Sequence, residues 1–286
     1  MAHTVDIGIF FIAKTELNLE ESRKWLNHVG ANEFELETLC KTDADALIEL
    51  AGRRCYMSFQ KGLNPNITKI RTDIAEYIEN ILSSGHGSVL EHASYSFAIE
   101  GVSRVFTGEM NRHRAGWAIS EGSMRYIRFD DIGYWIPPSL QYRADDLNVR
   151  QGMNTEEMER GKLAYKQAQS QSVFQQAFED AEKHYNELME IWKNELAPES
   201  KFYLKKQITS MMRRIIPMGV ATGGIWTGNL RAIRHVLTMR TSAAAEEEIC
   251  FVFSSIMKKI AELEPNIFGD FAQDEHGFWK PKYVKV

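Results

Sequence analysis

The chain has 286 residues, enough for one large domain or two small ones, and 44% of them are hydrophobic, as in a soluble globular protein with a sizeable core. Its net charge of −5 argues against a protein that coats nucleic acid, because that task needs a strong positive balance. No apolar segment approaches the length that crosses a membrane, so neither nucleic acid nor a membrane is an expected partner.

The first elements are predicted to be one strand and three helices. Residues 5–12 form a short apolar run that predicts a buried strand. Two glycines, Gly85 and Gly87, are expected to end the third helix and to allow a tight turn. The second helix is expected to be capped by Thr42 or Asp43. The three helical patterns cover residues 19–29, 42–54 and 68–83.

The middle of the chain is predicted to return to a sheet. Aromatic and aliphatic residues alternate with small or polar ones over 93–102, which predicts a strand. Ser103 then caps a short helix that leads to residues 112–114. A second strand is expected over 123–129.

The C-terminal half is predicted to be mainly helical. A long amphipathic helix is expected over 151–197, with packing or oligomer contact as its simplest role. Since no internal repeat or linker is visible, we expect one α+β domain over 1–286, with a mixed or antiparallel sheet flanked by helices and a helical insertion at about 140–200. Three further helical segments cover 201–216, 229–239 and 242–263.

The three cysteines, Cys40, Cys55 and Cys250, form no CxxC pair, so neither a disulfide framework nor a zinc site is indicated and we expect a reducing, cytoplasmic setting. Arg53 and Arg54 precede Cys55 and would favour its thiolate, whereas acidic residues precede Cys250 and would raise its pKa. Neither sequence context is typical of a catalytic thiol, so a cysteine nucleophile is not favoured.

Residues 85–92, Gly-His-Gly-Ser-Val-Leu-Glu-His, place two His, one Ser and one Glu within eight positions. They could bind a metal, but the spacing fits no helical ligand pair, and we expect no metal. They could also form a helix cap with His92 in the core. We favour a glycine-rich turn that brings Ser88 and backbone N–H groups toward a phosphate or a ring carbonyl.

Two basic groups are suited to an anionic ligand. Residues 112–114 read Arg-His-Arg, a row of side chains rich in N–H donors. The second group lies around a helix that Asn229 is expected to cap, and the N-terminal amides of that helix also attract anions. About half of these cations are expected to form a solvated face, while Arg231 and Arg240 lie off the apolar stripe. The second group comprises Arg213, Arg214, Arg231, Arg234, His235 and Arg240.

Together these residues resemble the flavin-dependent thymidylate synthase family. Its signature is RHR followed, after a spacer, by an acidic residue, any residue, Ser, any residue and Arg. Residues 112–114 and 121–125 match this signature, and residues 85–92 match the family's GHxSxxEH element. The downstream elements are matched by Arg213 with Pro217, and by Asn229, Arg231 and Arg240.

The resemblance implies a role for each matching residue. FAD would be held by Ser88, Glu91, Arg112, His113, Arg114, Asn229, Arg231 and His235. The nucleotide dUMP would be contacted by Glu109, Glu121, Gly122, Ser123, Met124, Arg125, Arg213 and Arg240. The catalytic residues would be Arg112, Arg240 and His86.

The resemblance also implies a reaction and an assembly. NADPH would reduce FAD, methylenetetrahydrofolate would donate the one-carbon unit, and the reduced flavin would deliver a hydride, so that dUMP becomes dTMP without a protein nucleophile. Family members are homotetramers whose active sites lie between subunits, so a homotetramer with shared sites is expected.

Departures from the family pattern keep alternatives open. The spacer before Glu121 is one residue longer than the common form, and Glu109 stands where Gln is frequent. A relative that modifies another pyrimidine nucleotide, such as UMP, is therefore the first alternative. A nucleic-acid-binding module fits the acidic balance poorly, and a structural oligomer built on 151–197 leaves the Arg clusters unexplained.

Overall fold

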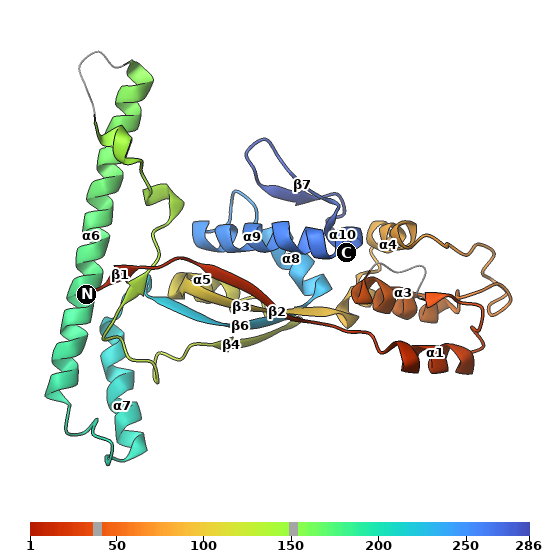
Figure 1. Ribbon diagram of the computed structural model, residues 1–286, viewed down its shortest axis with the longest axis horizontal. Coiled ribbons are helices and arrows are strands. Elements are labelled where there is room, and N and C mark those ends of the chain that lie inside the picture. The colour runs from red at the N-terminus through yellow and green to blue at the C-terminus, as the bar shows by residue number, and fades with distance from the viewer. Residues whose placement is uncertain (37–41, 149–153) are drawn as a thin grey trace. The chain divides into compact units, whose positions relative to one another are not determined.

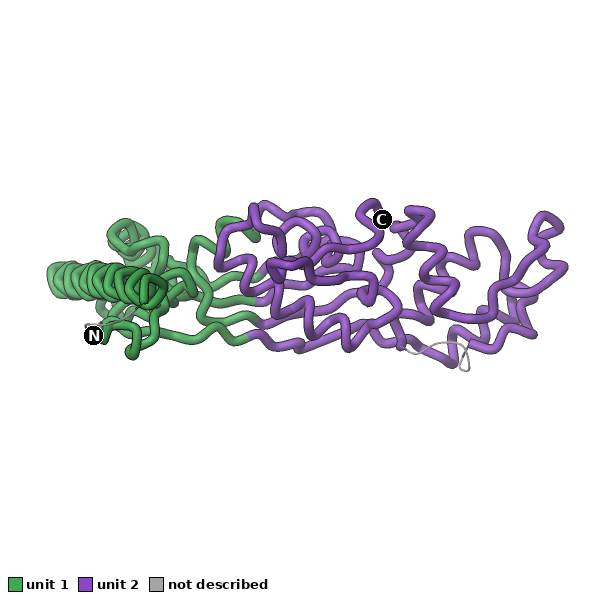
Figure 2. The backbone as a smooth tube through the Cα atoms, turned by 90° about the horizontal axis from the view of Figure 1, so that it is seen from above, with its two compact units in different colours: residues 1–8, 99–111, 120–224 green, residues 9–98, 112–119, 225–286 purple. Residues whose placement is uncertain are grey.

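The computed structural model describes residues 1–36, 42–148 and 154–286, so that Cys40 and the start of the predicted 151–197 helix lie outside it. The described chain divides into two compact units, coloured separately in Figure 2. Unit 1 comprises residues 1–8, 99–111 and 120–224. Unit 2 comprises residues 9–98, 112–119 and 225–286. Each unit is described by itself below.

Four strands form a sheet in the order β2-β3-β6-β4, and each strand has residues in both units. Strands β4 and β6 are antiparallel, because Asn229 N–H donates to the Gly116 carbonyl at one end and Gly122 N–H donates to the Gly223 carbonyl at the other. These strands are β2 (Gly8–Lys14), β3 (Ser94–Ser103), β4 (Trp117–Glu121) and β6 (Ala221–Asn229).

Two further strand pairs lie outside that sheet. Strand β1 (His3–Thr4) pairs in parallel with β5 (Gly133–Tyr134) in unit 1. Strand β7 (Phe271–Gln273) pairs antiparallel with β8 (Trp279–Pro281) in unit 2. The predicted combination of mixed strand pairing and helices is therefore confirmed for the described residues.

The described residues of unit 2 form six α-helices, which are labelled in Figure 1. Two predicted caps are confirmed: the Thr42 side chain accepts from Asp45 N–H, and the Asn229 side chain accepts from Ala232 N–H. The apolar stripe of α8 is also confirmed, since Leu230, Ile233 and Leu237 are fully buried. The helices are α1 (Leu19–His28), α3 (Asp43–Tyr56), α4 (Ile74–Ser83), α8 (Leu230–Arg240), α9 (Glu247–Leu263) and α10 (Pro265–Phe268).

Unit 1 is built on α5 (Arg104–Met110), α6 (Thr155–Ile191) and α7 (Phe202–Met212). Helix α6 is the long green helix of Figure 1, and its N-terminus carries a capping box between Asn154 and Glu157. Its buried residues include Phe178, whose ring stacks on Tyr134 with centroids 4.3 Å apart. The long predicted helix is therefore confirmed over 155–191.

Two strand predictions need correction. The strand expected over 123–129 is a turn, in which the Ser123 carbonyl accepts from both Tyr126 and Ile127 N–H groups. Residues 221–228, which separate two of the predicted helical segments, belong to strand β6 (221–229). A Cβ on Gly223 would overlap the Glu100 carboxylate, and a Cβ on Gly228 would lie 2.9 Å from the Trp117 ring. These glycines therefore allow close approach of neighbouring residues rather than marking a turn.

Two helices begin later than expected. Helix α4 begins at Ile74, where the Asp73 side chain accepts from Glu76 N–H, and not at residue 68. Helix α9 begins at Glu247, with the Glu246 side chain as its cap, and not at residue 242. In the part of the chain that the structure describes, no helix is both long and apolar enough to span a membrane.

Candidate active site

The predicted functional residues divide cleanly between the two units. All eight predicted FAD contacts lie in unit 2, together with His86 and Arg240. The other predicted dUMP contacts lie in unit 1: Glu109, Glu121, Gly122, Ser123, Met124, Arg125 and Arg213. The two groups are therefore described separately.

In unit 2, His113 and Arg240 lie together although they are 127 positions apart in sequence. Arg240 Nε donates to His113 Nε2 over 2.8 Å, so this ring nitrogen carries no proton and His113 acts as an acceptor. The His235 ring lies edge-on to His113, with centroids 6.1 Å apart. The flanking Arg112 and Arg114 are exposed. The RHR segment and α8 thus form one cationic, ring-bearing cluster.

Gly116 and Asn229 explain how these two segments meet. Gly116 has φ +75°, and a Cβ there would lie 2.7 Å from Asn229 Nδ2. Asn229 N–H donates to the Gly116 carbonyl over 3.0 Å, while its side chain caps α8. The glycine therefore permits the close approach that sets the RHR segment beside the start of α8.

Arg231, in the first turn of α8, pairs with Glu91. Its NH1 atom donates to the Glu91 carboxylate over 2.6 Å, and its Nε donates to the main-chain oxygen of Val286 over 3.2 Å. The remaining terminal nitrogen has no partner among the described residues. Arg231 is 43% exposed in its side chain, so this nitrogen is available to a ligand.

His86 and Ser88 line a cavity of about 390 Å³ in unit 2, a size that suits a small ligand. The segment 85–92 therefore presents Ser88 to a cavity. The alternative with His92 in the core is wrong, because His92 is exposed. The Arg53 guanidinium, which precedes Cys55 in sequence, is bound to Glu49.

Two cysteines of unit 2, Cys55 and Cys250, lie within the described residues, and both are free thiols. Burial, together with the charges of Glu246 and Glu247, raises the pKa of the Cys250 thiol, as expected from its neighbours. The Cys55 thiol donates to the Ala51 carbonyl over 3.4 Å. In the described ranges no group of His, Cys, Asp and Glu side chains is arranged to hold a metal ion.

Arg234 is a structural residue, contrary to the expectation of a solvated cation. It is 3% exposed, and its guanidinium binds the Asp270 carboxylate at 2.6 and 3.0 Å. It also donates to the carbonyls of Ile267 and Tyr283. A buried, fully bonded Arg of this kind ties the C-terminal elements to α8.

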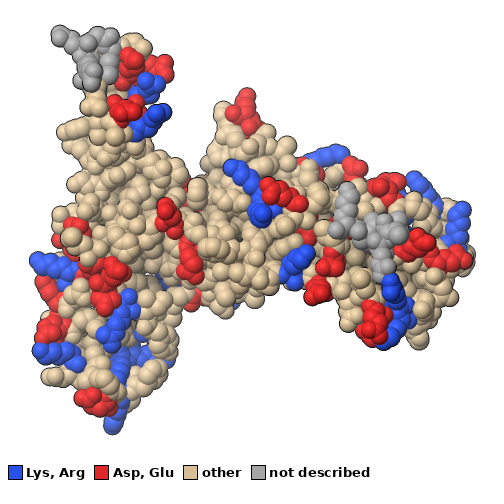
Figure 3. Space-filling model, viewed as in Figure 1, with Lys and Arg blue, Asp and Glu red and all other residues tan. Residues whose placement is uncertain are grey.

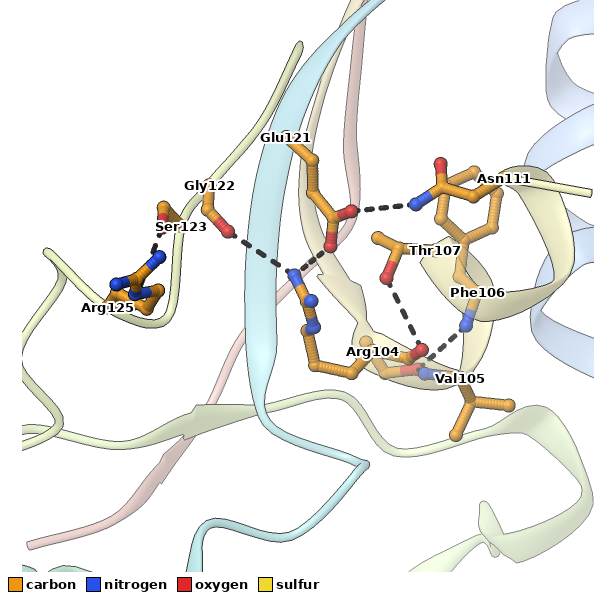
Figure 4. Close-up of polar contacts among 10 residues, drawn as sticks. Arg104, Val105, Phe106, Thr107, Asn111, Glu121, Gly122, Ser123 and Arg125 are labelled. Atoms are coloured by element: carbon orange, nitrogen blue, oxygen red, sulfur yellow. Dashed lines mark hydrogen bonds and ion pairs between the residues drawn. The ribbon is translucent and has the colours of Figure 1, made fainter. Parts of the chain in front are cut away.

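In unit 1, the Glu121 carboxylate is held from two directions (Figure 4). Arg104 NH1 donates to one carboxylate oxygen, and Asn111 Nδ2 donates to the other over 2.8 Å. Arg104 NH1 also donates to the Gly122 carbonyl over 3.3 Å. Burial, helped by the charge of Arg213, lowers the pKa of Arg104. The start of the 121–125 segment is therefore fixed by a charged network.

Helix α7 fixes the other end of the same segment. The Thr209 hydroxyl donates to the Arg125 carbonyl over 3.0 Å, and the Tyr126 ring stacks on Phe202. Lys206 lies 5.9 Å above the Tyr126 ring. Met124 packs on the apolar core of unit 1, which makes its side chain a packing element. Glu109 is half-buried on α5.

Arg125 and α7 border a cavity of about 790 Å³ in unit 1. Arg125 lines this cavity, and its Nε is buried with no hydrogen-bond partner among the described residues, an arrangement that is costly. Lys206 and Arg214 line the same cavity. Figure 3 shows Lys and Arg side chains gathered, with acidic ones among them, over the α7 part of unit 1. These cations suit a phosphate.

Sequence reasoning missed Arg104 and Lys206. The position of Arg104 could have indicated a role. It is the first residue of α5, where the helix dipole disfavours a cation, so a compensating acidic partner could have been expected. No sequence signal distinguished Lys206. It is one of two lysines on helix α7, and only the fold brings it to the cavity that Arg125 lines.

Comparisons with known proteins identify relatives of this chain. A family model described as thymidylate synthase complementing protein matches residues 37–266. A flavin-dependent thymidylate synthase of Mycobacterium tuberculosis is 32% identical over 275 residues, covering 95% of this chain and 92% of the relative. One from Mycobacteroides abscessus is 33% identical over 276 residues, with the same coverage of both chains.

A solved structure shares the fold at low sequence identity. It is a UMP/dUMP methylase, PolB, from Streptomyces cacaoi bound with 5-Br UMP, with a TM-score of 0.57, 16% identity and 94% of each chain covered. The family model spans most of the chain, and the relatives exceed 30% identity along nearly all of it. The chain therefore belongs to the flavin-dependent thymidylate synthase family.

Proposed function

We propose that this protein catalyses the reductive methylation of dUMP to dTMP, with FAD as cofactor, methylenetetrahydrofolate as one-carbon donor and NADPH as reductant. The observation that carries the proposal is a cavity lined by three cations, Arg125, Lys206 and Arg214, of which Arg125 also has a buried Nε with no partner among the described residues. A nucleotide phosphate carries nearly two negative charges and would satisfy these donors.

The residues of unit 2 fit a flavin dinucleotide. Arg231 keeps one terminal nitrogen for a phosphate or ribose oxygen, and the N-terminus of α8 adds backbone N–H groups. Arg240 holds the His113 ring by a hydrogen bond, and the His235 ring lies edge-on to it. Two rings and a guanidinium therefore lie close together. Ser88, Glu91, Arg112, Arg114 and Asn229 complete the proposed FAD contacts. Bound FAD supplies the hydride chemistry.

The chain's own residues would bind and orient the nucleotide. Arg125 and Arg213 hold the phosphate, with Ser123 beside them on the turn that α7 supports. Glu121 borders the pyrimidine, and its carboxylate is oriented by Arg104 and Asn111. Arg112 stabilises negative charge that develops on the uracil ring. His86 lies at the cavity where a folate would approach the flavin.

We further propose that the chain acts as one functional domain with a helical insertion, and that it assembles as a homotetramer with shared active sites in the cytoplasm. Support for assembly comes from large apolar side chains that are exposed on unit 1. Val173 is 68% exposed, Ile191 69% and Phe202 65%. A stable oligomer would bury such side chains.

The test is an absorbance spectrum of the purified protein, followed by titration with dUMP and, separately, with UMP. A bound flavin whose spectrum shifts with dUMP supports the proposal. A shift with UMP but not with dUMP favours the relative that modifies UMP. A protein that binds no flavin after incubation with FAD contradicts the proposal.

The matched variant is Arg125→Ala, with Arg143→Ala, an exposed arginine of the same unit, as its control. The first is expected to lose the dUMP-dependent shift while it keeps the flavin, because FAD is assigned to unit 2. The second is expected to keep both. Loss of the flavin from Arg125→Ala would contradict the division of roles between the two residue groups.

A further inference from the structure

The C-terminal segment, residues 282–286, lies against the turn that carries the proposed FAD contacts. Four hydrogen bonds that involve side chains anchor its first two residues. The Lys282 ammonium and the Tyr283 hydroxyl both donate to Glu79, at 2.8 and 2.7 Å. Arg234 donates to the Tyr283 carbonyl, and Tyr283 N–H donates to Asp270, each over 3.2 Å. The path of the following residues is therefore set by α4 and α8.

From this anchor the segment passes over Gly85 and Gly87. A Cβ on Gly85 would lie 3.3 Å from the Lys285 carbonyl oxygen. A Cβ on Gly87 would overlap the Val286 main-chain carbon and lie 2.8 Å from its oxygen. Gly87 has no positive φ, so its lack of a side chain serves this contact and not the conformation of the turn.

The segment ends at Arg231. The main-chain oxygen of Val286 accepts from Arg231 Nε, while the Glu91 carboxylate accepts from NH1. Two acceptors on two sides of a planar guanidinium fix its orientation. The third nitrogen has no hydrogen-bond partner among the described residues. An otherwise mobile surface Arg is thus held in one position before any ligand arrives.

We propose that residues 284–286 are a positioning element of the dinucleotide-binding site, which acts by holding the Arg231 guanidinium in the orientation that receives FAD. The inference rests on the proposed function, because it takes FAD as the ligand. The benefit is preorganisation: a side chain that is already ordered loses less entropy when the ligand binds.

The test compares FAD affinity in four proteins, measured by the quenching of flavin fluorescence. They are the full chain, a chain that ends at Tyr283, and the same two chains carrying Arg231→Ala. We expect the shortened chain to bind FAD about tenfold more weakly. With Arg231→Ala present, shortening is expected to change the affinity less than about twofold, because the residue through which the segment acts is gone.

Lys280→Ala is the control, since it removes a neighbouring exposed cation that pairs with Asp274 and not with Arg231. It should bind FAD like the full chain. Should the chain that ends at Tyr283 be poorly folded, a chain that lacks only Val286 removes the acceptor of Arg231 Nε, and it should weaken FAD binding in the same Arg231-dependent way.

Equal or tighter FAD binding by the shortened chain overturns the proposal, and so does an equal loss with and without Arg231. If the full chain binds no FAD at all, the proposed function itself fails. The two failures are therefore distinguishable.

Discussion

Removing the Arg104 guanidinium should both destabilise unit 1 and weaken nucleotide binding. In Arg104→Met the Glu121 carboxylate keeps Asn111 but loses its charged donor, and the Gly122 carbonyl loses its bond. Hydrogen bonds to charged groups contribute roughly 1.5–3 kcal/mol each. The side chains of Arg104 and Glu121 are 24% and 14% exposed, and water that reaches them offsets part of the loss. We expect unfolding to become easier by about 1–2 kcal/mol.

The assay is urea unfolding followed by the dUMP dependence of turnover. A loss of this size corresponds to a melting temperature lower by about 2–3 °C for a chain of this length. The KM for dUMP should rise about five- to tenfold, because the 121–125 segment is less fixed and each tenfold change corresponds to about 1.4 kcal/mol. Glu121→Gln combined with Arg104→Met should cost less than the sum of the two single changes.

The control is Lys193→Met, which breaks an ion pair with Glu190 whose side chains are 62% and 70% exposed. That pair should contribute less than about 0.5 kcal/mol. If Arg104→Met is as stable as this control and binds dUMP normally, the network around Glu121 does not hold the segment and the reasoning is refuted.

Three further predictions concern single side chains. Lys206→Ala should raise the KM for dUMP about tenfold with little change in kcat, because it removes one phosphate-facing charge; an unchanged KM in steady-state assays would contradict this. Asn229→Ala should lower stability in urea by about 1 kcal/mol through loss of the α8 cap, and no change would contradict the role of the cap. Burial raises the pKa of Glu264 above its ordinary 4.5. The folded chain should therefore lose stability as the pH rises from 4.5 through the raised pKa. Glu264→Gln should flatten the pH dependence of the free energy of unfolding, and an unchanged slope would contradict this prediction.

The elements that could be predicted are those specified by nearby residues. Strand β3 and helix α8 follow from alternation, an apolar stripe and the Asn229 cap, all of which are local signals. Strand β6 could not be predicted in this way. Its glycines serve side chains from other strands, such as Glu100, and a glycine-rich segment read alone resembles a loop.

The turn at 123–127 shows the same limit for the site. Its residues have the composition of a strand, but the Thr209 hydroxyl, 84 positions away, holds the Arg125 carbonyl in a turn. The ordered family motifs single out candidate site residues. The residues that support them could not be predicted, because Arg104, Thr209 and Lys206 lie outside those motifs and reach the segment only through the fold.

Arg231 and Arg234 show why sequence cannot separate a ligand-binding cation from a structural one. They stand three positions apart on α8, and both have the same side chain. Arg234 is buried, and Asp270 with two carbonyls neutralises and satisfies it, so no ligand can compete for its donors. Arg231 is 43% exposed, is held on two sides by Glu91 and Val286, and keeps a donor unused. The difference is set by residues 33 to 140 positions away. An Arg on a helix is therefore assigned to ligand binding when one of its N–H donors has no partner in the fold. Whether a donor has a partner depends on the fold and not on the sequence motif.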